Sequence, residues 1–347
     1  MKTTNAVSVI ICSHNGASRI EAVLDALQTQ SDTAGFSYEV ILVNNASTDD
    51  LEIRARACWL SQDASLKIVR ENRPGLAYAR QTGIEASQFP LICFVDDDNI
   101  VSRTFLWRAI QMMNKHPRAA VCGAHGVAKC TGPVPEWLWN GWKGHAVGPQ
   151  GDMEGTLPPG RHYVYGAGMI IRRSALDDLR RIGFVSLLSG RTGISLSSGE
   201  DVELCLALQL LGWTLIQSPA LKFQHLMPSS RLTWDYCLDL FYQFGRANAV
   251  LGIYSAWLPT SSPYKLLRRF YFGQIIHILL LRLKSALADR RTPTREGDSQ
   301  KLFARALKGQ VDAFRELLRA RLLKDYFLRV KALANSDRPG GGLVAQT

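Results

Sequence analysis

Two stretches of the sequence decide the fold: VSVIICSHNG at residues 7–16 and LICFVDDDN at residues 91–99. In each, a continuous apolar run that includes β-branched residues changes abruptly into polar residues. Such a run predicts a strand buried on both faces, as in a parallel sheet. Similar runs at residues 39–43 (EVILV) and 66–69 predict two more strands. A helical pattern follows each of the first three strands, for example at residues 75–86.

This alternation of strand and helix predicts a Rossmann-like, mostly parallel α/β sheet flanked by helices. Ligands bind such sheets at the carboxyl ends of the strands. The predicted strands end there in polar residues, SHN, NNAST, RENRPG and DDDN, so we expect the functional site at this edge. The first turn holds a single glycine, Gly16. The chain has neither GxGxxG at that turn nor GxxxxGK[ST], which disfavours dinucleotide binding and P-loop chemistry.

Composition excludes several classes of protein. The chain has 347 residues, of which 46% are apolar and 20% charged, so we expect it to fold. It has no run of about 20 apolar residues, which disfavours a membrane span. Its start lacks the layout of a secretory signal. The seven scattered cysteines include no CxxC pair, which favours reduced thiols in a cytosolic protein over disulfides or a structural zinc site.

The positive charge is concentrated towards the C-terminal end. The whole chain carries a net charge of +11, and residues 262–347, with 18 basic and 7 acidic residues, account for all of it. Residues 1–261 are therefore neutral. We accordingly predict a main domain at residues 1–261, a basic helical module at residues 262–335 and a disordered tail at residues 336–347.

Two helices are expected in the basic module. Residues 270–281 (FYFGQIIHILLL) are apolar around nearly the whole helix but too short to span a bilayer. A second helix is expected between residues 300 and 334, with an apolar stripe that includes Phe303, Leu307 and Val311 and a basic stripe beside it. A basic amphipathic helix suits an anionic membrane surface; the alternative is that its apolar stripe packs on the main domain. Nucleic acid is not expected as a partner, because no nucleic-acid motif accompanies the charge.

Three aspartates, Asp96, Asp97 and Asp98, follow the fourth predicted strand. Carboxylates this close repel one another unless a cation is present. Oxygen ligands suit Mg²⁺ or Mn²⁺, which bind carboxylates together with substrate phosphates. The alternative interpretation is a solvated acidic turn that caps a helix starting near Ser102.

A second acidic pair, Glu200 and Asp201, precedes a helical pattern at residues 202–211. One interpretation is that these acids only complement the helix dipole in a first turn. The functional interpretation is a general base that deprotonates an acceptor hydroxyl. A metal site and such a base would together make a group-transfer centre.

Six motifs, in this order, resemble those of family 2 glycosyltransferases with the GT-A fold: VSVIICSHNGA, EVILVNNASTDD, ENRPGLAYARQTGI, FVDDDN, YGAGMIIRRSAL and GEDVEL. The resemblance covers roughly residues 5–240. It implies a non-processive enzyme that transfers one sugar from a nucleotide-diphosphate sugar with inversion.

The resemblance also implies roles for individual residues. The aspartates match the DxD motif of the family: Asp98 would bind the metal, Mg²⁺ or Mn²⁺, with Asp96 beside it, and Asp96 and Asp97 would contact the ribose and metal-bound water. Asp201 would be the base, with Glu200 as its neighbour in the motif. The uracil and ribose pocket would be formed by Ser13, Asn15, Asn44, Asn45 and Arg80.

Two departures from the family pattern bear on the substrates. Many members have Asp-Asp-Gly-Ser after the second strand, whereas this chain has Asn44-Asn45-Ala46-Ser47, so the donor is expected to be a UDP- or GDP-sugar without a choice between them. The QxxRW motif of processive synthases does not occur in residues 225–234, which favours transfer of a single sugar. We expect a saccharide or lipid-linked acceptor and a cytoplasmic protein, peripheral on the inner face of the cell membrane. The alternative is a catalytically inactive protein that binds nucleotide sugars or carbohydrate.

Two segments between the acidic motifs have more than one interpretation. Residues 133–142 (PVPEWLWNGW) hold three tryptophans, which predict either a hydrophobic plug over the sheet or a stacking platform for a sugar or lipid. Residues 163–171 (YVYGAGMII) predict a strand in which Gly166 and Gly168 let a ligand approach the backbone. By the resemblance, this strand lines the donor-sugar pocket.

Two basic residues follow the Glu-Asp pair. His225 is either a structural histidine or, as in some GT-A enzymes, a third metal ligand. Arg231 is a candidate for a further positive group that faces the diphosphate.

Overall fold

The computed structural model describes residues 4–32, 35–139, 144–188, 190, 198–255, 257–258, 283 and 295–336. The strands are β1 (Ala6–Ser13), β2 (Ser37–Asn45), β3 (Ser65–Glu71), β4 (Leu91–Asp96), β5 (Asn99–Val101), β6 (Ala119–Cys130), β7 (Gly155–Thr156), β8 (Ile170–Arg172) and β9 (Thr214–Met227). The helices are α1 (Ile20–Gln28), α2 (Leu51–Cys58), α3 (Leu76–Ala86), α4 (Phe105–Lys115), α5 (Glu136–Trp139), α6 (Arg173–Arg181), α7 (Glu200–Leu210), α8 (Trp234–Ser255), α11 (Ser299–Arg319) and α12 (Leu322–Ala334), with a 3₁₀ turn at Ser229–Leu232.

In the described part of the chain, the strands form one sheet in the order β3-β2-β1-β4-β8-β6-β9-β5, with β7 paired to β9. β1 runs parallel to β2 and β4, and β2 runs parallel to β3. These four strands are the four predicted from the sequence, so the parallel α/β sheet is confirmed. Beyond β4 the sheet is mixed, because β8 lies antiparallel between β4 and β6.

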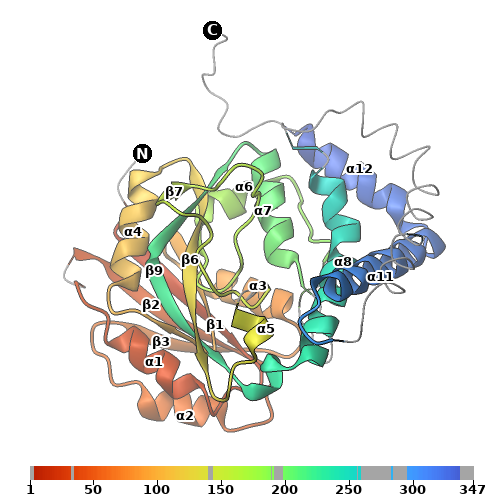
Figure 1. The fold of residues 1–347 in the computed structure, drawn as a ribbon. Coiled ribbons are helices and arrows are strands. Elements are labelled where there is room, and N and C mark those ends of the chain that lie inside the picture. Colours follow the sequence, from red (N-terminus) through yellow and green to blue (C-terminus); the bar gives the residue numbers. More distant parts are fainter. Residues whose placement is uncertain are drawn as a thin grey trace.

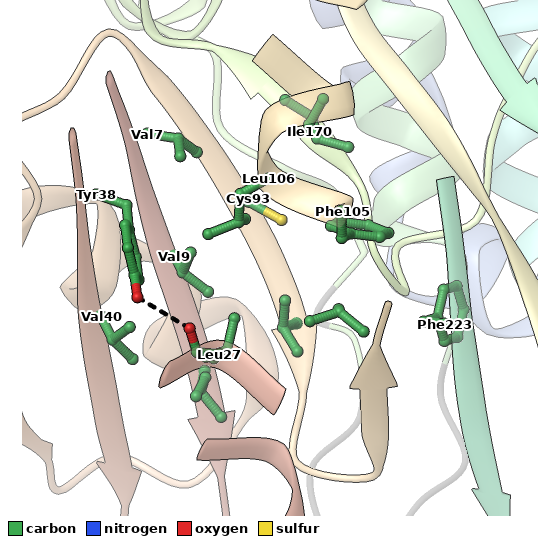
Figure 2. Close-up of a cluster of buried hydrophobic side chains, with 14 of the residues drawn as sticks. Val7, Val9, Leu27, Tyr38, Val40, Cys93, Phe105, Leu106, Ile170 and Phe223 are labelled. Atoms are coloured by element: carbon green, nitrogen blue, oxygen red, sulfur yellow. Dashed lines mark hydrogen bonds between the residues drawn. The ribbon is translucent and has the colours of Figure 1, made fainter. Parts of the chain in front are cut away.

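Helices cover both faces of the sheet, which explains the uninterrupted apolar runs (Figure 1). Alternate residues of a strand face opposite sides. Val9 therefore belongs to the core that includes residues of α1, α2 and α4, while Ile10 belongs to the core that includes residues of α3, α6, α7, α8 and α12. Figure 2 shows the first of these cores, in which the Tyr38 hydroxyl donates a hydrogen bond to the Leu27 carbonyl oxygen at 3.0 Å.

Two predicted element boundaries are wrong. The strand predicted at residues 163–171 is reduced to β8, because Gly168 has φ +67° and interrupts the extended backbone just before Ile170. The helix predicted from about Ser102 begins at Phe105, because residues 102–105 first form a turn in which the Phe105 N–H donates to the Ser102 carbonyl oxygen at 3.0 Å. The long strands β6 and β9 and the helix α8 add to the elements predicted from the sequence.

α11, the first described helix of the basic module, packs against α8 (Figure 1), and glycines lie where the two helices meet. A Cβ on Gly309 would overlap the Tyr242 carbonyl oxygen, and a Cβ on Gly245 would overlap the backbone of Ala306. Leu307 of the predicted apolar stripe is 6% exposed. The stripe thus packs on the main domain along this helix, whereas Phe303 is 56% exposed.

The prediction of one continuous helix up to residue 334 is wrong. Arg321 adopts a left-handed conformation with φ 58° and separates α11 from α12. α12 buries Leu323, Phe327 and Val330 in the core shared with α7 and α8. No helix in the described part of the chain has the length and apolarity needed to cross a membrane. Residues 270–281 lie outside the described residues, and the boundary at residue 261 stays a prediction.

Candidate active site

A cavity of about 1150 Å³ lies at the carboxyl ends of β1 and β4, where the sequence predicts the site. α7, α8 and residues 144–149 complete its walls. The predicted site residues that line it are Ser13, Asn45, Arg80, Asp96, Asp97, Asp98, Glu200, Asp201 and His225. The fold therefore brings together motifs that are far apart in the sequence.

Asp97 is held by the turn that follows β1. Its Oδ2 accepts hydrogen bonds from Ser13 Oγ at 2.6 Å and from Arg19 Nη2 at 2.8 Å. A Cβ on Gly16 would overlap both Ser13 Oγ and Asp97 Oδ2, so the single glycine of this turn makes room for the carboxylate. Burial raises the pKa of Asp97, while the positive charge of Arg19 opposes that rise.

Asp98 lies between two basic side chains. Its Oδ2 is 3.0 Å from Arg231 Nη1 and 3.5 Å from His225 Nε2. Antiparallel pairing of β5 with β9 sets Asn99 opposite His225, which explains this approach. Burial disfavours the Asp98 carboxylate, but its interactions with His225 and Arg231 outweigh this effect and lower the pKa of Asp98. With side chains 13% and 8% exposed, Asp97 and Asp98 do not form the solvated turn of the alternative interpretation.

The position of His225 leaves one ring nitrogen directed at Asp98. His225 Nδ1 is 2.8 Å from the carbonyl oxygen of His145. A carbonyl oxygen only accepts, so Nδ1 carries a proton and, in the neutral ring, Nε2 holds the lone pair. Asp98 Oδ2 and His225 Nε2 are thus an oxygen and a nitrogen donor side by side.

These two donors fit a divalent metal only in part. Within the described residues, no group of three or more His, Cys, Asp or Glu side chains could hold a metal ion. Mg²⁺ commonly keeps few protein ligands and completes its shell with water and substrate phosphates. Asp98 and His225 therefore fit a metal that arrives with a diphosphate, and not a metal cage made by the protein alone.

Asp201 is oriented through both of its oxygens. Oδ2 accepts a hydrogen bond from the Gly166 backbone N–H at 2.7 Å, and Oδ1 accepts one from the Val202 N–H at 2.8 Å. Glu200 and Asp201 occupy the first turn of α7, after Gly199 with φ +102°. They thus complement the helix dipole and also face the cavity, so the two interpretations of this pair are compatible.

Arg80 supplies a buried positive charge beside these acids. Its Nη1 is 3.3 Å from Glu200 Oε1, and its guanidinium lies 5.0 Å from the centre of the Phe94 ring. Burial lowers the pKa of Arg80, but the charges of Glu200 and Asp96 raise it by more, so the pKa is raised overall. A Cβ on Gly166 would come 2.7 Å from Arg80 Nη2, so the absence of a side chain at this position leaves room for the guanidinium.

Two residues assigned to the nucleotide pocket do not line the cavity. The Asn44 side chain donates to Glu52 Oε1 at 2.7 Å and faces a separate surface pocket. The Asn15 Oδ1 accepts a hydrogen bond from the Thr48 N–H at 2.8 Å. Both amides thereby hold the turns after β1 and β2.

Asn45 and Gly168 also have structural surroundings. Asn45 lines the cavity, but its Oδ1 accepts a hydrogen bond from the Gly75 N–H at 2.8 Å, which ties β2 to the start of α3. Gly168 is buried and does not line the cavity; a Cβ there would come 3.0 Å from the Ala124 Cβ. Of the two glycines expected near the donor, Gly166 is the one in the cavity wall.

Several cavity residues were not predicted from the sequence. Arg19 and the residues of α8 fall in this group, because nothing in the spacing of the acidic motifs points to them. The tryptophan segment lies apart from the cavity at Trp137, whose ring meets that of Trp234 edge-on at 5.2 Å. Leu138 beside it is buried, which supports the plug interpretation for this part of the segment.

Comparison with known proteins identifies the family of the first half of the chain. Residues 8–180, from β1 to α6, match the family model described as glycosyl transferase family 2. Over these residues the chain is a member of glycosyl transferase family 2. The matched region contains the three aspartates and Arg80, whereas Glu200, Asp201 and His225 lie beyond it.

Relatives share only part of the chain. The succinoglycan biosynthesis protein ExoM of Rhizobium meliloti is 27% identical over 191 residues, which are 52% of this chain and 56% of ExoM. The uncharacterized glycosyltransferase EpsJ of Bacillus subtilis is 36% identical over 104 residues, 29% of this chain and 28% of EpsJ. The chain thus spans about half or less of the length of these curated relatives.

A solved structure supports the fold along nearly the whole chain. The mannosyltransferase PcManGT of Pyrobaculum calidifontis, solved with GDP-Man and Mn²⁺, aligns with a TM-score of 0.50. The alignment covers 94% of this chain and 84% of that one, at 17% identity. It confirms the GT-A type of α/β fold predicted from the sequence.

Proposed function

We propose that this protein is a non-processive, inverting glycosyltransferase. It moves one hexosyl-type sugar from a UDP- or GDP-sugar to a saccharide or lipid-linked acceptor. The observation that carries the proposal is the single cavity in which Asp98 with His225, the Arg80 cation and the Asp201 carboxylate come together. Family membership and the relatives in polysaccharide synthesis support the same reaction class.

In this proposal, Asp201 is the general base. An acceptor hydroxyl is a weak nucleophile until its proton is removed, and a carboxylate within hydrogen-bond reach removes it as attack proceeds. The two backbone N–H groups on Asp201 keep its oxygens in one orientation and leave lone pairs for the hydroxyl. No second carboxylate is needed as a nucleophile, because the sugar passes directly to the acceptor and its anomeric configuration inverts.

The leaving diphosphate is proposed to lie against Asp98, His225 and Arg231. Asp98 and His225 would hold Mg²⁺ or Mn²⁺, which when bound offsets the charge that develops on the diphosphate. Arg231 now bonds to Asp98 at 3.0 Å, and its positive charge suits a phosphate oxygen equally well. Ser13, Asp96 and Asp97 are proposed to contact the nucleotide next to this group.

The experiment that tests the proposal is incubation of the protein with Mn²⁺ and a panel of UDP- and GDP-sugars, followed by measurement of released nucleoside diphosphate. Release that depends on an acceptor supports a transferase and names the donor. Tight binding of a nucleotide sugar without release, with any acceptor in the panel, would favour the inactive binding protein instead.

We also propose that the enzyme works in the cytoplasm at the inner face of the cell membrane. The observation behind this is the surface where α11 meets α12, at which Leu318, Leu322 and Leu328 are 41%, 39% and 48% exposed. Arg319, Arg321, Lys324 and Arg329 are exposed in the same stretch of sequence, where Asp325 pairs with Arg329 at 3.8 Å. Apolar side chains among basic ones suit an anionic lipid surface.

Vesicle sedimentation tests the membrane proposal. Arg321→Glu with Lys324→Glu should release the protein from phosphatidylglycerol vesicles at low salt, and binding of the wild type should weaken as salt rises. Arg108→Glu, at an exposed position on α4, is the matched control. A wild type that ignores these vesicles at low salt would contradict the proposal.

A further inference from the structure

The cavity has a second, mostly apolar wall that the reaction centre does not use. One face of α8 provides it, with the residues Tyr236, Phe241, Phe244, Ala247, Asn248 and Leu251. We call these residues the α8 wall. Residues 241, 244, 248 and 251 are spaced as one face of a helix, so the wall is a continuous surface and not a set of scattered contacts.

The aromatic part of the α8 wall is a pair of tilted rings. The centres of Phe241 and Phe244 are 5.7 Å apart, and their planes are inclined by 60°. Both rings, and that of Tyr236, are half-buried, so each keeps a surface open to the cavity. A nucleoside diphosphate would meet the charged side of the cavity, and these rings would not be needed to bind its phosphates.

The segment 144–149 adjoins the α8 wall in the lining of the cavity. Gly144, with φ +90°, passes so close to Phe244 that a Cβ there would overlap the ring. The Gly148 carbonyl oxygen accepts a hydrogen bond from the Tyr165 hydroxyl at 2.7 Å, which fixes the other end of the segment. The wall and this segment therefore form two sides of one compartment.

Polar groups on the α8 wall have hydrogen-bonding capacity to spare. The Asn248 side chain is exposed, and within the described residues it makes no hydrogen bond. The same holds for the Tyr236 hydroxyl, although its ring lies 5.8 Å from that of His145. Aromatic faces beside an unpaired amide and hydroxyl match a pyranose, which has an apolar C–H face and an edge of hydroxyls.

We infer that the α8 wall is the acceptor subsite and that the acceptor group bound there is a pyranose. Its C–H face lies on Phe241 and Phe244, and its hydroxyls bond to Asn248 and Tyr236. An alkyl chain in this place would bury the Asn248 amide without a partner, which is unfavourable. The inference rests on the proposed function only in that it assigns the bound saccharide the role of acceptor. Binding of a saccharide at this wall is measurable without turnover.

The test is saturation-transfer NMR with the full-length protein, diamagnetic Mg²⁺ and either UDP or GDP. The probes are methyl glycosides of glucose, galactose, mannose and N-acetylglucosamine, and the octyl glycosides of the same sugars. We expect a methyl glycoside to bind the wild type, and Phe241→Ala and Asn248→Ala each to weaken it at least fivefold. Phe303→Ala, an exposed phenylalanine on α11 outside the cavity, is the control and should bind as the wild type does.

Equal losses for methyl and octyl glycosides, with unchanged UDP or GDP affinity by calorimetry, support the inference. Losses for the octyl glycosides alone mean that the wall holds a lipid chain, and parallel losses of UDP or GDP affinity mean that it belongs to the donor; either overturns the inference. The inference is also overturned if the wild type binds no glycoside. It is overturned as well if Asn248→Ala, a substitution at an exposed position that should not disturb folding, binds every glycoside as the wild type does.

Release of nucleoside diphosphate and binding of glycosides distinguish failure of the proposed function from failure of the saccharide site. If the wild type binds a methyl glycoside at the α8 wall but releases no nucleoside diphosphate from any donor, the transferase proposal fails while the saccharide site stands. If it releases nucleoside diphosphate but the wall variants keep their glycoside affinity, the site assignment fails while the transferase stands.

Discussion

The backbone N–H of Gly166 donates a hydrogen bond to Asp201 Oδ2 at 2.7 Å, across 35 residues of sequence. This bond joins the irregular segment before β8 to the first turn of α7. Gly166 also lies against the Arg80 guanidinium, at a distance that leaves no room for a Cβ. One glycine thus positions both the proposed base and the buried cation beside it.

Asp201→Asn should lower turnover about 10²–10⁴-fold, the usual contribution of a general base. The amide keeps the shape of the carboxylate, and its oxygen still accepts one of the two backbone N–H bonds, from Gly166 or from Val202. The donor is proposed to bind at other residues, so donor affinity should change less than twofold. Glu200→Gln should lower turnover less, because Glu200 pairs with Arg80 and does not receive the proton. Initial rates at saturating donor and calorimetry of donor binding give the two quantities.

The stereochemistry gives a second test of the same assignment. Direct displacement converts an α-linked donor into a β-linked product, which proton NMR of the new linkage detects. Retained configuration would point to a covalent intermediate and a different residue. An Asp201→Asn variant with normal turnover would also show that another group takes the proton.

Asp98→Asn should abolish transfer and weaken nucleotide-sugar binding at least tenfold, while the circular dichroism spectrum stays unchanged. The reason is that the amide loses one negative oxygen donor beside His225. EDTA should abolish activity of the wild type, and Mg²⁺ or Mn²⁺ should restore it. Asp152→Asn, an exposed aspartate away from the cavity, is the control. Full activity in EDTA would contradict the metal requirement.

The sequence predicted the half of the fold in which strand and helix alternate regularly. β1, β2 and β4 have long buried apolar runs because helices cover both faces, and this pattern identifies a parallel sheet directly. β3 lies at the edge of the sheet, is only partly buried and contains Lys67. β6 and β9 were missed, since glycines and polar residues break their apolar runs, for example at Gly123 and Gln217. The strand predicted at residues 163–171 is too long. The composition of this segment suits a strand, but Gly168 turns the backbone.

Residue types at strand ends predicted the edge of the sheet at which the cavity lies, but not all of the residues that line it. Asp96, Asp98 and Asp201 were predicted because they lie in motifs that occur in the order found in family 2 glycosyltransferases. Asn15 and Asn44 were assigned to the nucleotide by their position in such motifs, whereas their amides hydrogen-bond within turns. The sequence of the α8 wall does not by itself predict a binding surface, because an aromatic face on a helix also suits a hydrophobic core. Only the tertiary structure distinguishes the two.

Glu71 should make the stability of the protein depend on pH. The hydrogen bond from Arg73, with help from the Arg73 N–H and Thr82, lowers the pKa of Glu71 to about 2. A carboxyl whose pKa is lower in the folded state stabilises the fold above its ordinary pKa, and this contribution disappears as the pH falls from about 4.5 towards 2.

Glu71→Gln should therefore lower the free energy of unfolding by about 1–2 kcal/mol at pH 7. The difference from the wild type should shrink as the pH approaches 2. Urea unfolding at pH 7, 5 and 3 measures it, with Glu85→Gln, an exposed glutamate on α3, as the control. A difference that stays constant with pH would mean that Glu71 acts by packing and not by charge.

The crossing of α8 and α11 should be the most sensitive point of the basic module. A Cβ on Gly309 would overlap the Tyr242 carbonyl oxygen, and backbone atoms cannot turn aside as a side chain does. Gly309→Ala must push the helices apart, which should cost about 1–3 kcal/mol of stability despite the better helix propensity of alanine. Gly252→Ala is the matched control: it lies on α8 with no atom within 4 Å of the added Cβ, so it should leave stability unchanged or raise it by up to about 1 kcal/mol. Thermal and urea unfolding of both variants decide the matter. A Gly309→Ala variant as stable as Gly252→Ala would mean that α11 does not pack on α8 in solution as it does in this structure.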